Sequence, residues 1–158
     1  MHLYDDADFT GCLETSRSTS GVYLCIHGPG AAFPIAGSSK RQTNVSHSTP
    51  EAEIAAADFA IRTIGIPALT LWSTLLRKDV CLQFHEDSQA VIAVMRAGRP
   101  DKLRHLNRTR RVSIDWLHER SQDPAYDLIW EKSAKQAADI FTTAFPDIHK
   151  MAKHMCSN

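Results

Sequence analysis

The strongest constraint on the fold of this chain is that three strand patterns precede its first helix pattern. Short runs rich in apolar and β-branched residues occur at 2–9, 21–26 and 31–38. Gly28, Pro29 and Gly30 separate the second run from the third, and such residues are typical of a hairpin turn. The first forty residues are therefore expected to form strands, not helices.

From Thr49 onward, helix and strand patterns alternate. Thr49 is a good N-cap residue and Pro50 suits the first helical position, so a helix is expected to begin here and to end at Gly65 and Pro67. The later elements are expected as helices at 69–77, 88–97, 109–120 and 135–145, and as strands at 80–84 and 126–130. This order predicts an α/β fold with a mixed five-stranded sheet flanked by helices.

Length and composition are typical of one globular domain. The chain has 158 residues, of which 43% are hydrophobic and 23% charged, so it can bury a single core. We expect the domain to cover residues 1–146, followed by a loosely ordered tail at 147–158. No apolar run approaches the roughly 18 residues of a membrane span, and we expect no membrane association.

The cysteines favour neither a disulfide framework nor a zinc site. They lie far apart and form no C-x-x-C pair, so we expect reduced thiols and an intracellular protein. The four cysteines are Cys12, Cys25, Cys81 and Cys156. His149, His154 and Cys156 lie close together near the end of the chain, but their spacing matches no standard metal site.

Four acidic residues lie at or near the ends of the expected elements and are the main candidates for a functional site. They are Asp6, Glu53, Asp87 and Asp139. Carboxylates that a fold brings together repel one another unless cations lie between them, and oxygen ligands suit Mg²⁺ or Mn²⁺. Two such ions about 4 Å apart can hold the attacking and leaving oxygens of a phosphodiester cleavage.

Five phrases that contain these residues resemble, in order and spacing, the ribonuclease H domain of copia-type (LTR) retrotransposon polyproteins. The phrases are YDDADFTGC, RSTSGVYL, SSKRQTNVSHSTPEAEI, EDSQAVIAV and KQAADIFTTAF, and the resemblance covers about residues 3–146. It implies the ribonuclease H-like fold and hydrolysis of the RNA strand of RNA–DNA hybrids during reverse transcription. It also implies two Mg²⁺ or Mn²⁺ ions held by Asp6, Glu53, Asp87 and Asp139.

The same resemblance implies a partner and a location. The partner is the reverse transcriptase domain of the same polyprotein, and the location is the cytoplasm, including virus-like particles, or the nucleus. Two other functions stay open. A decayed or co-opted copy would bind nucleic acid without cutting it, although all four carboxylates are present. A transposase or integrase domain would have the acids in the order Asp, Asp, Glu, whereas the glutamate comes second here.

Several neighbouring acids compete for these roles. Strand alternation places Asp5 and Asp6 on opposite faces, and the family phrase selects Asp6. Asp8 is expected to be a turn residue or to lie behind the metal ligands, and Glu51 to point elsewhere around the helix than Glu53. Asp87 would equally serve as an N-cap, and Asp139 as a solvated acid of the last helix.

Basic and hydroxyl residues suggest how a nucleic acid would be held. The segment 96–111 carries seven basic residues opposed by one aspartate, which creates a positive field suited to phosphates, although a solvated loop is the alternative. The expected contacts are Arg104, Arg108, Arg110, Lys40, Ser48 and Thr49. The loop 131–136 lacks the histidine that some ribonucleases H carry there.

Overall fold

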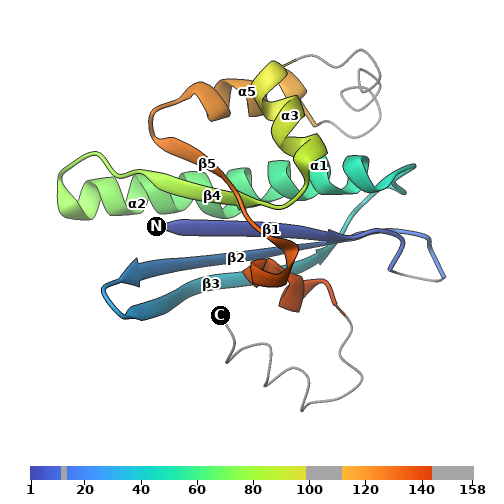
Figure 1. The fold of residues 1–158 in the computed structure, drawn as a ribbon, viewed down its shortest axis with the longest axis horizontal. Helices are drawn as coiled ribbons and strands as arrows, with labels where there is room; N and C mark the ends of the chain where they lie inside the picture. The colour runs from blue at the N-terminus through green and yellow to red at the C-terminus, as the bar shows by residue number, and fades with distance from the viewer. Residues whose placement is uncertain (12–13, 99–111, 144–158) are drawn as a thin grey trace.

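A computed structural model describes residues 1–11, 14–98 and 112–143 and shows a mixed five-stranded sheet (Figure 1). The strand order is β3-β2-β1-β4-β5. The strands are β1 (His2–Asp8), β2 (Thr19–Gly28), β3 (Ala31–Arg41), β4 (Leu82–Glu86) and β5 (Tyr126–Trp130). β1, β2 and β3 pair antiparallel, whereas β4 pairs parallel with both β1 and β5. The predicted architecture is therefore confirmed.

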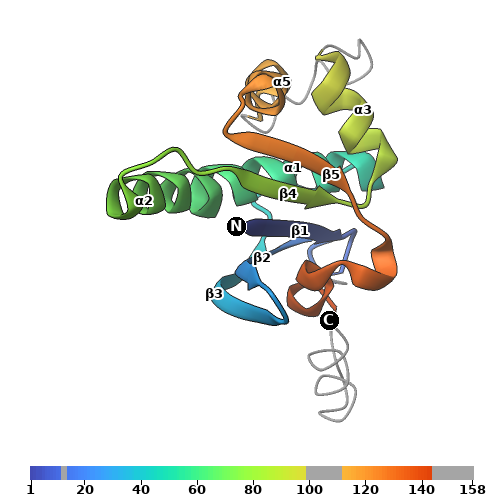
Figure 2. The same ribbon diagram turned by 60° about the vertical axis from the view of Figure 1, so that its left-hand side comes forward.

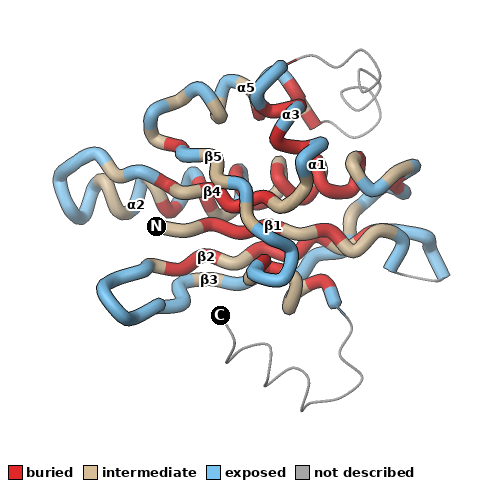
Figure 3. Tube along the Cα trace, in the orientation of Figure 1, coloured by how far each residue is buried: buried red, intermediate tan, exposed pale blue. Residues whose placement is uncertain are grey.

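Helices cover one face of the sheet, and a short 3₁₀ segment covers part of the other (Figure 2). The helices on the first face are α1 (Thr49–Ala60), α3 (Gln89–Ala97) and α5 (Ile114–Gln122). Fully buried Leu3, Ile54 and Leu117 belong to the core between these helices and the sheet. Figure 3 shows this buried layer along β1, β2 and α1. The opposite face has a smaller cluster of Tyr4, Cys25 and Ala138.

The long helical stretch does not end at Gly65 and Pro67, as the sequence predicted. α1 continues through a π-helical turn, η1 (Ile61–Gly65), into α2 (Ile66–Leu76). Pro67 lies in the first turn of α2, where its missing N–H leaves no intrahelical bond unmade. Gly65 has ordinary right-handed helical angles, φ −61° and ψ −55°, so it continues the helix instead of capping it.

Because the helices are continuous, residues Thr49–Leu76 form a stretch long and apolar enough to cross a membrane, and one 18-residue window in it has a mean hydropathy of 1.4. The stretch is not an uninterrupted apolar run, since it contains Glu51, Glu53, Asp58 and Arg62. In addition, 44% of that window is buried inside the protein, and α1 packs against β1 and β2. A core helix of a globular domain has the same composition, so the stretch is weak evidence for a membrane span.

The last expected helix also differs from its prediction. In place of an α-helix at 135–145, the structure has two 3₁₀ segments, η3 (Ser133–Lys135) and η4 (Ala137–Phe141). Gln136 separates them because its backbone is extended, with ψ 99°, and its buried side chain bonds the carbonyl of His85 at 3.4 Å. The expected domain boundary at 146 and the tail lie outside the described residues.

The remaining boundaries shift by a few residues. β5 has the predicted bounds, whereas β4 begins two residues later than expected and β3 extends three residues further. α3 begins at Gln89, and α5 begins at Ile114, whereas the pattern placed its start at 109; residues 109–111 lie outside the described part. These shifts do not change the end of the sheet at which the acidic residues of β1 and β4 lie.

Candidate metal centre

Three of the four predicted acids meet at one end of the sheet. One carboxylate oxygen from each of Asp6, Glu53 and Asp87 lies within 4.8 Å of the other two. Asp6 is on β1, and Asp87 directly follows β4, which pairs parallel with β1 through Tyr4 and His85. Two residues further along both strands, Asp6 and Asp87 are therefore neighbours. Glu53 reaches them from α1, which packs on β1.

Burial and the neighbouring carboxylates raise the pKa values of Glu53 and Asp6. Burial, followed by the charges of Asp6 and Asp87, raises the pKa of Glu53 to about 8. Burial also raises the pKa of Asp6 to about 6, although the Thr142 hydroxyl, which donates a hydrogen bond to Asp6, acts in the opposite direction. The pKa shifts indicate a site whose charge is not balanced by cationic side chains.

Asp139 lies beside this set, on the sheet face that Asp6 shares with Tyr4. It lies in η4 and is not one of the three acids within 4.8 Å, yet its charge contributes to the raised pKa of Asp6. Asp6, Asp139 and Thr49 line a shared open cavity of about 470 Å³. The Thr143 hydroxyl donates to Asp139 at 2.7 Å. Asp139 therefore occupies the edge of the site, on a 3₁₀ turn instead of the expected α-helix.

Two further acids lie behind the site, and sequence analysis did not identify one of them, Glu86. Asp5 and Glu86 are each 1% exposed. Neither oxygen of Asp5 has a hydrogen-bond partner among the described residues, and only one oxygen of Glu86 accepts a bond, from the Ser88 N–H at 2.8 Å. Burial, and then the charge of Glu86, hold the pKa of Asp5 well above its usual range. Strand alternation in LQFHE would have placed Glu86 on the buried face with Leu82.

The rival acids have other roles or positions. Asp5 lies on the strand face of Leu3, opposite Asp6, so the predicted separation of the two aspartates is confirmed. Buried Glu51 accepts a hydrogen bond from the backbone N–H of His47 at 2.9 Å and so holds the loop before α1. Asp8 lines the same cavity as Asp139 without joining the close set.

Serines, not the residues expected, stand at the two helix N-caps near the site. Ser88 is the N-cap of α3, and its hydroxyl accepts a hydrogen bond from the N–H of Val91 at 3.4 Å. Asp87 is therefore not the N-cap and lies free of that role. Ser48 is the N-cap residue of α1, whereas Thr49, predicted as the cap, is the first residue of the helix.

The predicted nucleic-acid contacts are only partly described. Thr49 is exposed and lines the acidic cavity. Lys40 is exposed on β3 in the same cross-strand row as Ser20 and Ala7, so it lies at the acidic end of the sheet, about 10 Å away by two strand spacings. Its ammonium lies 4.9 Å from the centre of the Phe59 ring. Arg104, Arg108 and Arg110 lie outside the described residues.

The packing of η4 against the sheet depends on two glycines of neighbouring strands. A Cβ atom on Gly21 would lie 2.7 Å from Thr142 Cγ2, and one on Gly37 would overlap the Phe141 ring. We expect Gly37→Val to displace η4, and with it Asp139 and Thr142, so that a reaction at the three carboxylates would slow by about 10²-fold, as after a misplacement of about 1 Å. Gly28→Val is the matched control, because a Cβ there meets nothing within 4 Å. Equal activity of the two variants would contradict this role.

The three close carboxylates fit a hard divalent cation. All offered donors are oxygens, which Mg²⁺ and Mn²⁺ prefer, and a buried oxygen of Glu53 has no hydrogen-bond partner among the described residues. A cation would supply the missing partner and relieve the repulsion that raises the pKa of Glu53. Asp6, Glu53 and Asp87 would hold it, with Asp139 beside them.

Comparison with known proteins finds similar solved structures. No protein-family model matches the sequence, and no curated protein sequence matches it. LC11-RNase H1, isolated from compost by a metagenomic approach, has a TM-score of 0.55 at 15% identity, over 98% of this chain and 96% of that one. A second structure of LC11-RNase H1, in complex with an RNA/DNA hybrid, has a TM-score of 0.53 at 15% identity, over 87% of this chain and 90% of that one.

A third solved structure extends the likeness to another organism. RNase H1 from the halophilic archaeon Halobacterium salinarum NRC-1 has a TM-score of 0.53 at 13% identity, over 87% of this chain and 89% of that one. Identities this low carry information on the fold alone. The TM-scores and coverages, together with the strand order and the mixed pairing, show that this chain has the ribonuclease H-like fold.

Proposed function

We propose that this protein is a divalent-cation-dependent endonuclease that hydrolyses the RNA strand of RNA–DNA hybrids. The observation that carries the proposal is the meeting of Asp6, Glu53 and Asp87 within 4.8 Å at one end of a ribonuclease H-like sheet. The complex of LC11-RNase H1 with an RNA/DNA hybrid supports the choice of substrate. The order of the acids, with the glutamate second, favours this activity over that of a transposase.

Some residues of the site would bind the cations, and others would position a ligand carboxylate or the RNA strand. When bound, two Mg²⁺ or Mn²⁺ ions supply an activated water and charge stabilisation for the leaving 3′-oxygen, so no protein nucleophile is needed. Asp6, Glu53 and Asp87 would hold the cations, and the Thr142 hydroxyl donates a hydrogen bond that positions Asp6. The exposed hydroxyl of Thr49 is placed at the cavity to bond a 2′-OH group, the group that distinguishes RNA from DNA.

We also infer that the chain acts within a retroelement. The five phrases that resemble copia-type polyproteins support this context. The reverse transcriptase domain of the same polyprotein would then be its partner, and it would act in the cytoplasm, in virus-like particles or in the nucleus. Co-purification of the chain with that reverse transcriptase domain, expressed as a separate protein, tests the partnership.

Asp87→Asn tests the proposed activity. The change removes one charge from the cation site at nearly constant side-chain size, so we expect cleavage of the RNA strand to fall by about 10²–10³-fold, as after loss of one group that stabilises the transition state. The measurement is cleavage of an end-labelled hybrid with Mg²⁺, with Mn²⁺ and with chelator. Single-stranded RNA and double-stranded DNA serve as reference substrates.

Asp79→Asn is the matched control, because Asp79 is exposed in the turn after α2, away from the site. It should cut at the wild-type rate. Cleavage of the hybrid in chelator would contradict the cation dependence, and normal cleavage by Asp87→Asn would contradict the assignment of Asp87. Wild-type protein that binds the hybrid in Mg²⁺ and Mn²⁺ without cutting it would favour the decayed copy.

A further inference from the structure

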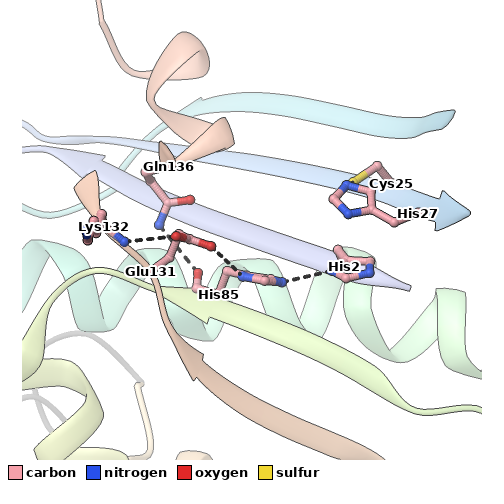
Figure 4. Close-up of polar contacts among 7 residues, drawn as sticks. All are labelled: His2, Cys25, His27, His85, Glu131, Lys132 and Gln136. Carbon is pink, nitrogen blue, oxygen red and sulfur yellow. Dashed lines mark hydrogen bonds and ion pairs between the residues drawn. The ribbon is translucent and has the colours of Figure 1, made fainter. Parts of the chain in front are cut away.

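A second group of metal-ligating side chains lies on the sheet face of Asp6, toward the opposite end of β1 (Figure 4). It comprises Cys25 and His27 of β2, His2 of β1 and His85 of β4. The register explains the gathering: His2 is the cross-strand partner of Cys25, and Tyr4, two residues on, pairs with His85. The proposed nuclease activity uses none of the four.

The donor atoms of the group already lie in two close pairs. His2 Nδ1 is 3.0 Å from His85 Nε2, and Cys25 Sγ is 3.2 Å from His27 Nε2. The rings of His2 and His27, one from each pair, stack with their centres 4.0 Å apart. Two nitrogens bound to one tetrahedral Zn²⁺ at about 2.0–2.1 Å lie roughly 3.3 Å apart, so the His2–His85 separation needs little change.

Glu131 orients His85 in the way that a metal ligand requires. Its Oε2 lies 3.3 Å from His85 Nδ1, on the far side of the ring from His2, and its Oε1 accepts a hydrogen bond from the N–H of Lys132 at 3.1 Å. With its proton on Nδ1, on the side of the carboxylate, His85 has the lone pair of Nε2 facing His2. Carboxylate–histidine pairs of this kind accompany histidine ligands of zinc.

Burial favours the neutral, metal-binding state of His2 and His85 by lowering the pKa of each ring. Burial, and then the neighbouring His27 and His85, lower the pKa of His2 to about 4, so its ring is neutral at physiological pH. Cys25 and His85 are buried, whereas His27 is exposed, which gives a cation a path from solvent. Burial raises the pKa of the Cys25 thiol to about 11, so binding there would release its proton.

We propose that Cys25, His27, His2 and His85 bind one Zn²⁺ ion, at a site separate from the acidic centre. The donor types separate the two sites: one sulfur and three imidazole nitrogens suit a borderline-soft cation such as Zn²⁺, whereas the carboxylates suit Mg²⁺. Closing the two pairs onto one ion requires His27 to leave its stack on His2. The exposed position of His27 leaves room for that rotation.

The test uses Co²⁺ as a spectroscopic probe of the full-length chain. A thiolate ligand gives Co²⁺ an intense charge-transfer absorption in the near ultraviolet, and a tetrahedral site gives strong visible bands. We expect both signals to saturate at one Co²⁺ per chain and to disappear when Zn²⁺ is added. A variant that combines Cys12→Ser, Cys81→Ser and Cys156→Ser, and so keeps Cys25 as its single thiol, should retain them.

Three variants test the ligands, with Zn²⁺ affinity measured by competition with a chromophoric chelator. Cys25→Ser should lose the charge-transfer absorption, and the exposed His27→Asn should bind Zn²⁺ at least tenfold more weakly. Glu131→Gln should keep the absorption and weaken binding by about 10–100-fold, as loss of a group that orients a ligand does. Should buried Cys25→Ser fail to fold, His27→Asn and Glu131→Gln decide the matter.

Asp87→Asn serves as the control that separates this proposal from the nuclease activity, because it alters the acidic centre alone. It should bind Zn²⁺ like wild type, whether or not the wild-type protein cuts hybrids. Wild-type protein that gives no thiolate absorption with Co²⁺ would overturn the proposal. Unchanged Zn²⁺ affinity in both His27→Asn and Glu131→Gln would overturn it as well.

Discussion

Asp6→Asn should lower cleavage of the hybrid by about 10²–10³-fold, whereas Asp5→Asn should leave most of it. Asp6 belongs to the set of three carboxylates within 4.8 Å, and the change removes its charge from that set. Asp5 points to the opposite face of β1, toward the core, where its carboxyl is fully buried beside Glu86. The two neighbours therefore differ in consequence because of the strand pleat alone.

The physical state of Asp5 explains why its change should be mild. Its pKa is held well above the usual range by burial and by the charge of Glu86, which favours the neutral carboxyl, and the amide of asparagine resembles that form in charge and size. We expect the free energy of unfolding of Asp5→Asn to stay within about 1 kcal/mol of wild type. Both variants should be assayed on one hybrid, with thermal unfolding as the check on folding. An inactive Asp5→Asn beside an active Asp6→Asn would refute the assignment.

The parts of the site that follow from local periodicity could be predicted from the sequence. The period of two in β1 separates Asp5 from Asp6, and the parallel pairing of β4 with β1 brings Asp87 beside Asp6. The three acids of the close set were all among the predicted ligands. The alternation of β4 contained equivalent information on Glu86, but the expected strand ended at residue 84, so Glu86 fell outside it.

The parts that depend on tertiary contacts could not be predicted. Gly65 and Pro67 are helix-ending residues by propensity, yet the helix continues because a π turn precedes Pro67 and because Gly65 packs against Leu3 and Leu82. η4, which replaces the expected α-helix, approaches the sheet closely at Gly21 and Gly37, and this contact is tertiary. The partners in these contacts, Leu3 and Leu82 for Gly65 and the two sheet glycines for η4, lie far away in the sequence, so the local pattern carries no signal of them.

The His–Cys group shows the same limit for a binding site. Cysteine spacing alone excluded a zinc site made of cysteines, and that inference concerned ligands close together in sequence. The group described above takes its ligands from three strands, and His85 is separated from His2 by 83 positions. Only the register, with His2 opposite Cys25, brings them to one place.

Glu53→Gln should abolish cleavage and at the same time stabilise the protein at pH 8 in chelator. Glu53 is 7% exposed, and its pKa in the folded protein is about 8, against about 4.5 for an unperturbed glutamate. Between these two values the folded state binds the proton that the unfolded state has lost, so stability falls as pH rises. Glutamine has no charge to bury, and its variant should therefore escape this loss.

The measurement is the midpoint of thermal unfolding, Tm, between pH 6.5 and pH 8. In this window the raised pKa values of Asp5 and Glu86 lower the stability of wild type and of Glu53→Gln alike, so the difference between the two proteins reports Glu53. The histidines His2 and His85 contribute little, because their lowered pKa values add stability only as pH rises toward 6.5. In chelator the Glu53 carboxyl should account for a fall of roughly 3–6 °C in the wild-type Tm, which corresponds to about 1–2 kcal/mol for a chain of this length. The Tm of Glu53→Gln should fall less.

Added Mg²⁺ should reverse the order of the two proteins in Tm at pH 8. In wild type the cation binds the ionised carboxylates, which the folded state alone brings together, so added Mg²⁺ should raise the Tm more at pH 8 than at pH 6.5. Glu53→Gln lacks one of the three close ligands and should gain little. Equal gains in the two proteins would show that Glu53 is not a ligand, and a wild-type Tm that rises with pH in chelator would contradict the raised pKa of Glu53. Stability without the cation and activity with it are then opposite consequences of one buried carboxylate.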